Sequence, residues 1–183
     1  MPIIAKDTGG EDYENAPTGN QLAVCAFVED IGTHRGEYQG VPNERHQIVI
    51  CWELAETMTT GEYAGRPFML SKFYTLSLAK KANLRQDLES WRGKAFTDEE
   101  LKGFDVEKLK GVNCLLNVIE EKGRSKIASI SPPIKGMDPL AVTNTEPPAW
   151  IDRKRQESIE ATEGGGNTTV PEPEPYDHGD LPF

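Results

Sequence analysis

The sequence predicts a mainly β fold, a small five-stranded barrel, and three observations lead to this prediction. Five stretches rich in β-branched, aromatic and aliphatic residues lie between residues 21 and 136. One amphipathic helical stretch separates the third of them from the fourth. Gly, Pro and Asn fill the gaps, which is typical of turns. With 183 residues, the chain has room for one such domain and for terminal segments outside it.

The first three expected strands cover residues 22–28, 46–54 and 68–76. In the second, alternation places Ile48, Ile50, Trp52 and Leu54 on one face. The Gly-rich segment between the first two strands is expected to form a loop of about a dozen residues. Residues 58–67 are expected to form another turn-rich connection.

A helix is expected over residues 80–92, because Leu84, Leu88 and Trp91 recur at spacings of four and three. Gly93 follows as a stop signal. Thr97 and Glu100 have the spacing of a capping box, which predicts a short second helix. Residues 106–109 are expected to form a further turn.

The last two strands are expected at residues 112–119 and 125–130, joined by a hairpin turn that contains Gly123. The order of three strands, a helix and two strands is that of the OB-fold, a five-stranded Greek-key barrel, and other small barrels also have five strands. The predicted organisation is a flexible segment 1–20, an OB-fold domain 21–136, a disordered acidic linker 137–175 and a terminal tip 176–183. The linker contains three consecutive glycines, 164–166, and alternating Pro and Glu at 171–175.

The formal net charge of −10 is unevenly distributed. Residues 21–136 contain 16 acidic and 16 basic residues, whereas residues 137–183 contain ten acidic and three basic ones. The acidity therefore belongs to the terminal segments, and it does not exclude a nucleic-acid partner for the central domain.

The three cysteines have no metal-ligand spacing and lie in apolar runs, so we expect buried free thiols. The N-terminus is too short and polar for a signal peptide, and no apolar run reaches the length of a membrane span. We expect a soluble protein of the cytoplasm. Neither a catalytic triad nor a phosphate loop is present in the sequence, so we expect no enzyme activity, metal or cofactor.

The chain closes on an apolar tip, Leu181-Pro182-Phe183, preceded by Asp177 and Asp180. This tip resembles that of bacterial single-stranded-DNA-binding proteins, which end in Asp-Asp-Ile-Pro-Phe after an OB domain and a linker. Asp180, Pro182 and Phe183 match, Leu181 replaces Ile, and Gly179 stands where the family has a second Asp. The resemblance implies that Asp177, Asp180, Leu181, Pro182 and Phe183 dock on replication, recombination and repair proteins.

A second resemblance concerns the barrel. Residues 71–78 and 88–93 look like segments of bacteriophage proteins related to single-stranded-DNA-binding proteins. Together the two resemblances imply a phage-encoded protein that acts in the cytoplasm of a bacterial host.

Binding of single strands needs cations for the backbone and aromatic faces for the bases. In OB-folds these come from strands 2 and 3 and from the connections after strands 1 and 4. The candidate DNA-binding residues are Arg35, Tyr38, Arg45, Trp52, Lys72, Tyr74, Lys122, Arg124 and Lys126. Trp52 also fits the core, and either Phe73 or Tyr74 must face inward. Residues 153–155 form a basic patch in the expected linker. We interpret this patch as either a solvated surface or a secondary contact with DNA.

The sequence-based hypothesis is sequence-independent binding and protection of single-stranded DNA in replication and recombination, with recruitment of partners by the tip. The alternative is an OB-fold adaptor that binds no DNA and uses the tip to engage host replication proteins.

Overall fold

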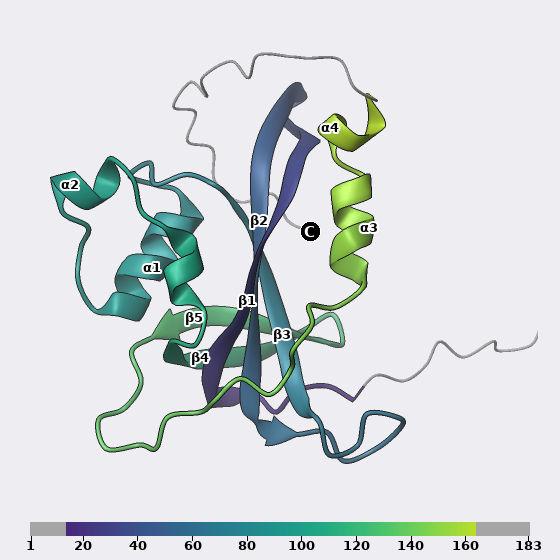
Figure 1. Cartoon of the computed structure of the whole chain (residues 1–183), viewed down its shortest axis with the longest axis vertical. Helices are drawn as coiled ribbons and strands as arrows, with labels where there is room; N and C mark the ends of the chain where they lie inside the picture. The colour runs from purple at the N-terminus through teal and green to yellow at the C-terminus, as the bar shows by residue number, and fades with distance from the viewer. Residues whose placement is uncertain (1–13, 164–183) are drawn as a thin grey trace, which may run out of the picture.

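The computed structural model describes residues 14–163. The strands are β1 (Gly19–Tyr38), β2 (Val41–Thr57), β3 (Pro67–Thr75), β4 (Asn113–Glu121) and β5 (Arg124–Ser131). The helices are α1 (Asn83–Arg92), α2 (Asp98–Leu101), the 3-10 helix η1 (Val106–Leu109), α3 (Trp150–Gln156) and α4 (Ile159–Thr162). The predicted five strands and the helix between the third and fourth are confirmed, and the fold is mainly β (Figure 1).

The five strands form one antiparallel sheet in the order β3-β2-β1-β4-β5. β1 and β2 are much longer than predicted, because the expected loop between them is a continuous hairpin that pairs up to Tyr38 and Val41. We call its outer part, residues 30–46, the arm. Register shifts after Cys25 and Asp30 bend β1 between the sheet and the arm. The predicted loop was therefore wrong.

The sheet is not closed into the predicted barrel. β3 and β5 are its edges, and no strand pairing joins them within the described residues. Helix α1 packs against both edges: the Ser90 hydroxyl donates to the Ile130 carbonyl of β5 at 2.5 Å, and Asp87 accepts from Lys72 and Tyr74 of β3, each at 2.7 Å. β3 and β5 therefore approach each other beside α1, but no strand pairing joins them in the described part of the chain.

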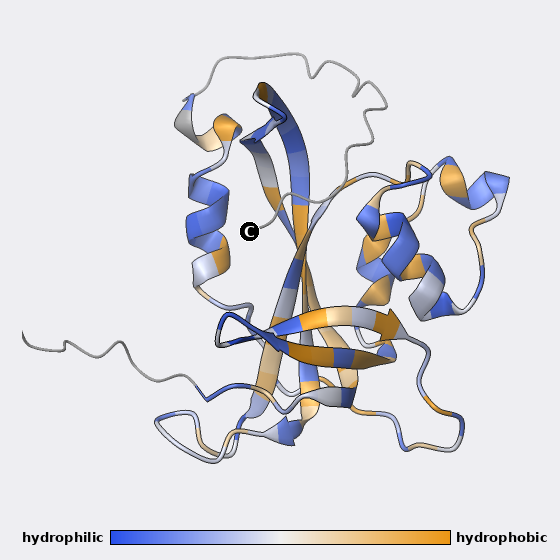
Figure 2. Cartoon of the chain, turned by 180° about the vertical axis from the view of Figure 1, so that it is seen from behind, coloured by the Kyte–Doolittle hydropathy of each residue, from blue (hydrophilic) through white to orange (hydrophobic). Residues whose placement is uncertain are grey.

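Two apolar clusters lie on opposite faces of the sheet. The inner one packs the sheet against α1 and contains the predicted stripe of Ile48, Ile50, Trp52 and Leu54 with the helical Leu84, Leu88 and Trp91. The outer one includes Phe27, Val49 and Cys51, with Ile151 of α3 buried against them. Figure 2 shows the apolar residues running along the strands between the two helical layers. Alternation along β2 thus supplies both clusters.

Local signals in the helical segment are confirmed. Gly93 has φ 68° and caps the C-terminus of α1, a conformation that suits glycine. Thr97 and Glu100 form both hydrogen bonds of the predicted capping box at the start of α2. None of the helices in the described part of the chain is long and apolar enough to cross a membrane.

The predicted linker boundary at residue 137 needs correction, because residues 137–163 pack on the outer face of the sheet. We call residues 137–149 the strap; it leads into α3 and α4. Glu53 of β2 is only 2% exposed, and its carboxylate accepts four hydrogen bonds from Thr143 and Asn144 of the strap, at 2.7–2.9 Å. This buried carboxylate holds the strap to the sheet.

Candidate nucleic-acid interface

The candidate residues Arg35, Tyr38 and Arg45 lie on the strands of the arm and not on a loop. The Arg35 side chain is 66% exposed and forms ion pairs with Glu44, at 3.4 Å, and with Glu163, at 2.6 Å. Tyr38 stands at the end of β1, where its hydroxyl accepts from Gln39 at 3.1 Å. The arm therefore presents cations and an aromatic ring, with part of its charge neutralised.

Three candidates point into the molecule, which corrects their assignment to a DNA surface. Trp52 is fully buried, with its ring centroid 5.9 Å from that of Trp91. Tyr74 is 3% exposed, and Lys72 pairs with Asp87 beside it. The physical reason is the register of β3, which turns Lys72 and Tyr74 toward α1. These three side chains offer no ring face or free charge to a strand of DNA.

Of the neighbouring pair Phe73 and Tyr74, it is Tyr74 that faces inward. Phe73 faces outward from the sheet, and its ring lies against Trp150 of α3, with centroids 5.7 Å apart. The helix α3 thus covers the outer face of β2 and β3.

Lys122, Arg124 and Lys126 lie exposed at the β4–β5 hairpin. Lys122 and Gly123 both have positive φ, 51° and 75°, as a tight two-residue turn requires. Lys126 pairs with Glu121 at 2.7 Å. Lys122 and Arg124 form no ion pair with a carboxylate of residues 14–163. This hairpin is the part of the predicted site that stays open to an anionic ligand.

The basic patch of residues 153–155 lies between the two hairpins. α3 and α4 run alongside the arm and contact β1 (Figures 1 and 2), and Ser125 of the β4–β5 hairpin lines the same groove as Pro148, just before α3. Arg155 ties α3 to β1 through Glu29 and through the Asp30 carbonyl, while Arg153 is exposed. The arm, α3 and the β4–β5 hairpin carry eight basic and six acidic residues, a small excess of positive charge, and we call the surface that they form the cationic side.

A groove of about 440 Å³ continues this side beyond the β4–β5 hairpin. Its walls include Tyr63 and Arg66 of the β2–β3 connection, which sequence reasoning passed over as turn residues. The signal that could have drawn attention to them is an aromatic and a cation in a connection with few apolar residues.

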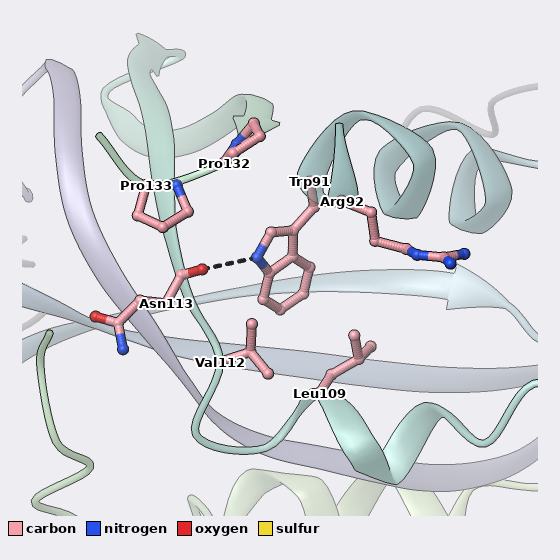
Figure 3. A pocket seen from close by; sticks show the side chains of 7 residues that line it. All are labelled: Trp91, Arg92, Leu109, Val112, Asn113, Pro132 and Pro133. Atoms are coloured by element: carbon pink, nitrogen blue, oxygen red, sulfur yellow. Dashed lines mark hydrogen bonds between the residues drawn. The ribbon is translucent and has the colours of Figure 1, made fainter. Parts of the chain in front are cut away.

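A second hollow, of about 280 Å³, lies at the opposite, helical side (Figure 3). Trp91, Leu109 and Val112 form its apolar wall, and the Trp91 indole donates to the Asn113 carbonyl at 2.9 Å. Its lining is mainly apolar, its cation Arg92 pairs with Glu100, and its one aromatic ring is buried in the core, so we interpret it as a packing gap.

The described residues contain no group of three or more His, Cys, Asp or Glu side chains that could hold a metal ion. The predicted partner-binding residues Asp177, Asp180, Leu181, Pro182 and Phe183 lie outside the described residues. Comparison with protein-family models, with curated proteins and with solved structures finds no match to this chain.

Proposed function

We propose that this protein binds single-stranded DNA with little base preference and recruits partner proteins through its C-terminal residues. The observation that carries the proposal is the gathering of exposed cations on the cationic side. Lys122, Arg124 and Arg153 are exposed there and form no ion pair with any carboxylate of residues 14–163. Such cations attract a phosphate backbone independently of its sequence.

The strand arrangement supports an OB-like fold. β1 pairs with both β2 and β4, and the sheet is open only between β3 and β5, where α1 packs. OB-folds are partly open Greek-key barrels that bind oligonucleotides with the connections after strands 1 and 4. In this chain those connections are the tip of the arm and the β4–β5 turn, which border the cationic side.

The burial of Trp52 and Tyr74 changes the route proposed for the DNA. Because α3 covers the outer face of β2 and β3, we propose that the bound DNA strand follows the arm, the exposed face of α3 and the β4–β5 hairpin. Arg35, Tyr38, Arg45, Lys122, Arg124 and Lys126 remain as proposed contacts, and Arg153 joins them.

Fluorescence anisotropy of labelled oligo-dT with the full chain tests the proposal. We expect binding that weakens as salt rises, because a protein that neutralises Z phosphates of a single strand gives a log–log slope of about −0.7Z. The double reversal Lys122→Glu with Arg124→Glu should weaken binding at least tenfold at low salt. The matched control, Lys80→Glu with Lys108→Glu, changes charge equally on the helical side and should bind like the wild type.

The proposed role of the tip is tested separately. Deleting residues 174–183 should leave DNA binding intact or tighter, since it removes acidic residues that compete with DNA for cations. The same deletion should abolish the capture of host replication proteins. A loss of DNA binding on this deletion would contradict the proposed division of labour.

One observation favours the adaptor as a second candidate. Several predicted DNA contacts are engaged in ion pairs, among them Arg35, Lys72 and Lys126. If the wild type fails to bind oligo-dT at any salt concentration while the tip still captures replication proteins, the adaptor is the better description.

A further inference from the structure

The connection between β2 and β3 is a rigid loop. Met58 and Arg66 close its base, where the Met58 amide donates to the Arg66 carbonyl at 2.9 Å and the Gly65 amide donates to the Met58 carbonyl at 2.7 Å. The carboxylate of Glu14 accepts four hydrogen bonds from the amides and hydroxyls of Thr59 and Thr60, at 2.7–3.2 Å. A loop held in this way presents its side chains with little further entropy to lose on binding.

Tyr63 projects from this loop. It is 41% exposed, and the guanidinium carbon of Arg66 lies 5.4 Å from its ring centroid. Arg66 is itself exposed and forms no ion pair with a carboxylate in the described part of the chain. An aromatic face and an unneutralised cation therefore stand together on a fixed support, as a stacking site for bases requires.

The groove of about 440 Å³ opens beside Tyr63, a volume within the range of small-ligand sites. Its far wall includes Ser125 of β5, next to Arg124 and Lys126. Asn15 donates to the Gly123 carbonyl at 3.0 Å, so the N-terminal wall of the groove is bonded to the β4–β5 turn. The groove thus connects Tyr63 to the cationic hairpin.

We propose that this groove is a nucleobase subsite: one base of the bound strand stacks on Tyr63, and its flanking phosphates contact Arg66 and Arg124. The inference rests on the proposed function and extends it to Tyr63 and Arg66, which the sequence did not indicate. Asn144 and Ser125 also line the groove. The Asn144 side-chain amide donates to Glu53 and the Ser125 hydroxyl donates to the Ala16 carbonyl, so their oxygens are the groups offered to the polar edge of a base, as acceptors.

The charge of Glu14 sets the orientation of the nucleotide. Hydrogen bonds from Thr59, above all from its side chain, lower the pKa of Glu14, so this carboxylate is ionised at neutral pH. A phosphate beside it would be repelled. The base therefore occupies the end of the groove near Glu14, and the phosphates lie toward the two arginines.

The test compares Tyr63→Ala and Tyr63→Phe with the wild-type full chain in anisotropy titrations with oligo-dT. We expect Tyr63→Ala to weaken binding roughly 5- to 100-fold, the range for loss of one stacked base. Tyr63→Phe keeps the ring face and should bind within about twofold. Leu76→Ala, which changes a residue that is 42% exposed outside the groove, is the matched control and should have no effect.

Photocrosslinking to oligonucleotides that carry 5-iodouracil gives an independent readout. We expect the crosslinked peptide to contain Tyr63. Equal affinity of Tyr63→Ala and the wild type, or crosslinks confined to other peptides, would overturn the subsite while leaving DNA binding established. A wild type that binds no oligo-dT would instead overturn the proposed function, and the subsite with it. Urea unfolding of each variant confirms that the comparison concerns folded protein.

Discussion

Glu53 offers the sharpest test of how the strap is held. Its buried carboxylate accepts hydrogen bonds from the amide and hydroxyl of Thr143 on one oxygen and from the backbone and side-chain amides of Asn144 on the other. Burial by itself raises the pKa of Glu53, but these hydrogen bonds outweigh it, and the pKa lies below its usual value. The group is therefore ionised at neutral pH, and Glu53→Gln removes the charge with little change of shape.

The size of the effect follows from these four hydrogen bonds. Hydrogen bonds to a charged group each contribute about 1.5–3 kcal/mol, and neutral ones about 0.5–1.5 kcal/mol. The Gln oxygen keeps two of them in neutral form, while its NH2 group faces donors of the other residue and leaves a backbone amide unsatisfied. The smaller desolvation cost of the neutral side chain offsets part of the loss. We expect a destabilisation of about 2–4 kcal/mol.

Equilibrium urea unfolding of the full chain measures this change, and hydrogen exchange read by mass spectrometry locates it. We expect faster exchange in the strap at residues 137–149, because the backbone amide of either Thr143 or Asn144 loses its acceptor. Glu56→Gln is the matched control, since Glu56 is exposed on the same strand. A Glu53→Gln variant within about 0.5 kcal/mol of the wild type, with unchanged exchange in the strap, would refute the role assigned to Glu53.

Three further predictions follow from the packing. Gly32 has φ 78°, and a Cβ there would lie 2.7 Å from that of Ser158, so Gly32→Ala should lower the unfolding free energy by about 2 kcal/mol or more; an unchanged urea midpoint would contradict the docking of α4. Burial acts to raise the pKa of Glu160, but hydrogen bonds from Thr33 lower it to about 2. Its folded pKa is below the unfolded one, so its contribution is present at neutral pH and lost as the pH falls toward 2. The Thr33 amide resonance should titrate near that pH, and a midpoint near 4.5 would argue against the contact. Burial raises the pKa of all three cysteine thiols, so Ellman's reagent should label none at pH 8 until denaturant is added.

The periodic patterns predicted the strands and helices well, because each pattern involves residues that are close in the sequence. Alternation along β2 placed Ile48, Ile50, Trp52 and Leu54 together in the inner cluster, where the structure has them. The spacing of Leu84, Leu88 and Trp91 predicted α1, and all three are buried. Each pattern depends only on residues within one or two helical turns, or within a few residues along a strand. The sequence alone is therefore enough to predict which side chains share a face.

The candidate site was predicted less well, because it depends on pairs of residues far apart in the chain. The arm was expected to be a loop, since Gly32, Gly36 and Gly40 weaken its strand signal. Pairing between β1 and β2 nevertheless continues through it, because each strand supplies the other's backbone hydrogen bonds. The inward orientation of the Tyr74 side chain likewise depends on Asp87 of α1, whose carboxylate accepts a hydrogen bond from the Tyr74 hydroxyl.

The five strands, the helix between the third and fourth, and the face of β2 that enters the inner cluster all follow from local patterns in the sequence. Contacts between distant residues are needed to explain why the sheet stays open at α1 and why α3 packs on its outer face through Ile151 and Trp150. α3 is a helix of seven residues in an acidic segment, too short to stand out as an amphipathic pattern. The strap that leads into α3 is bonded to Glu53, which precedes Thr143 by 90 residues in the chain. Such a buried hydrogen bond between distant residues exists only after folding has brought them together, so no local pattern predicts it.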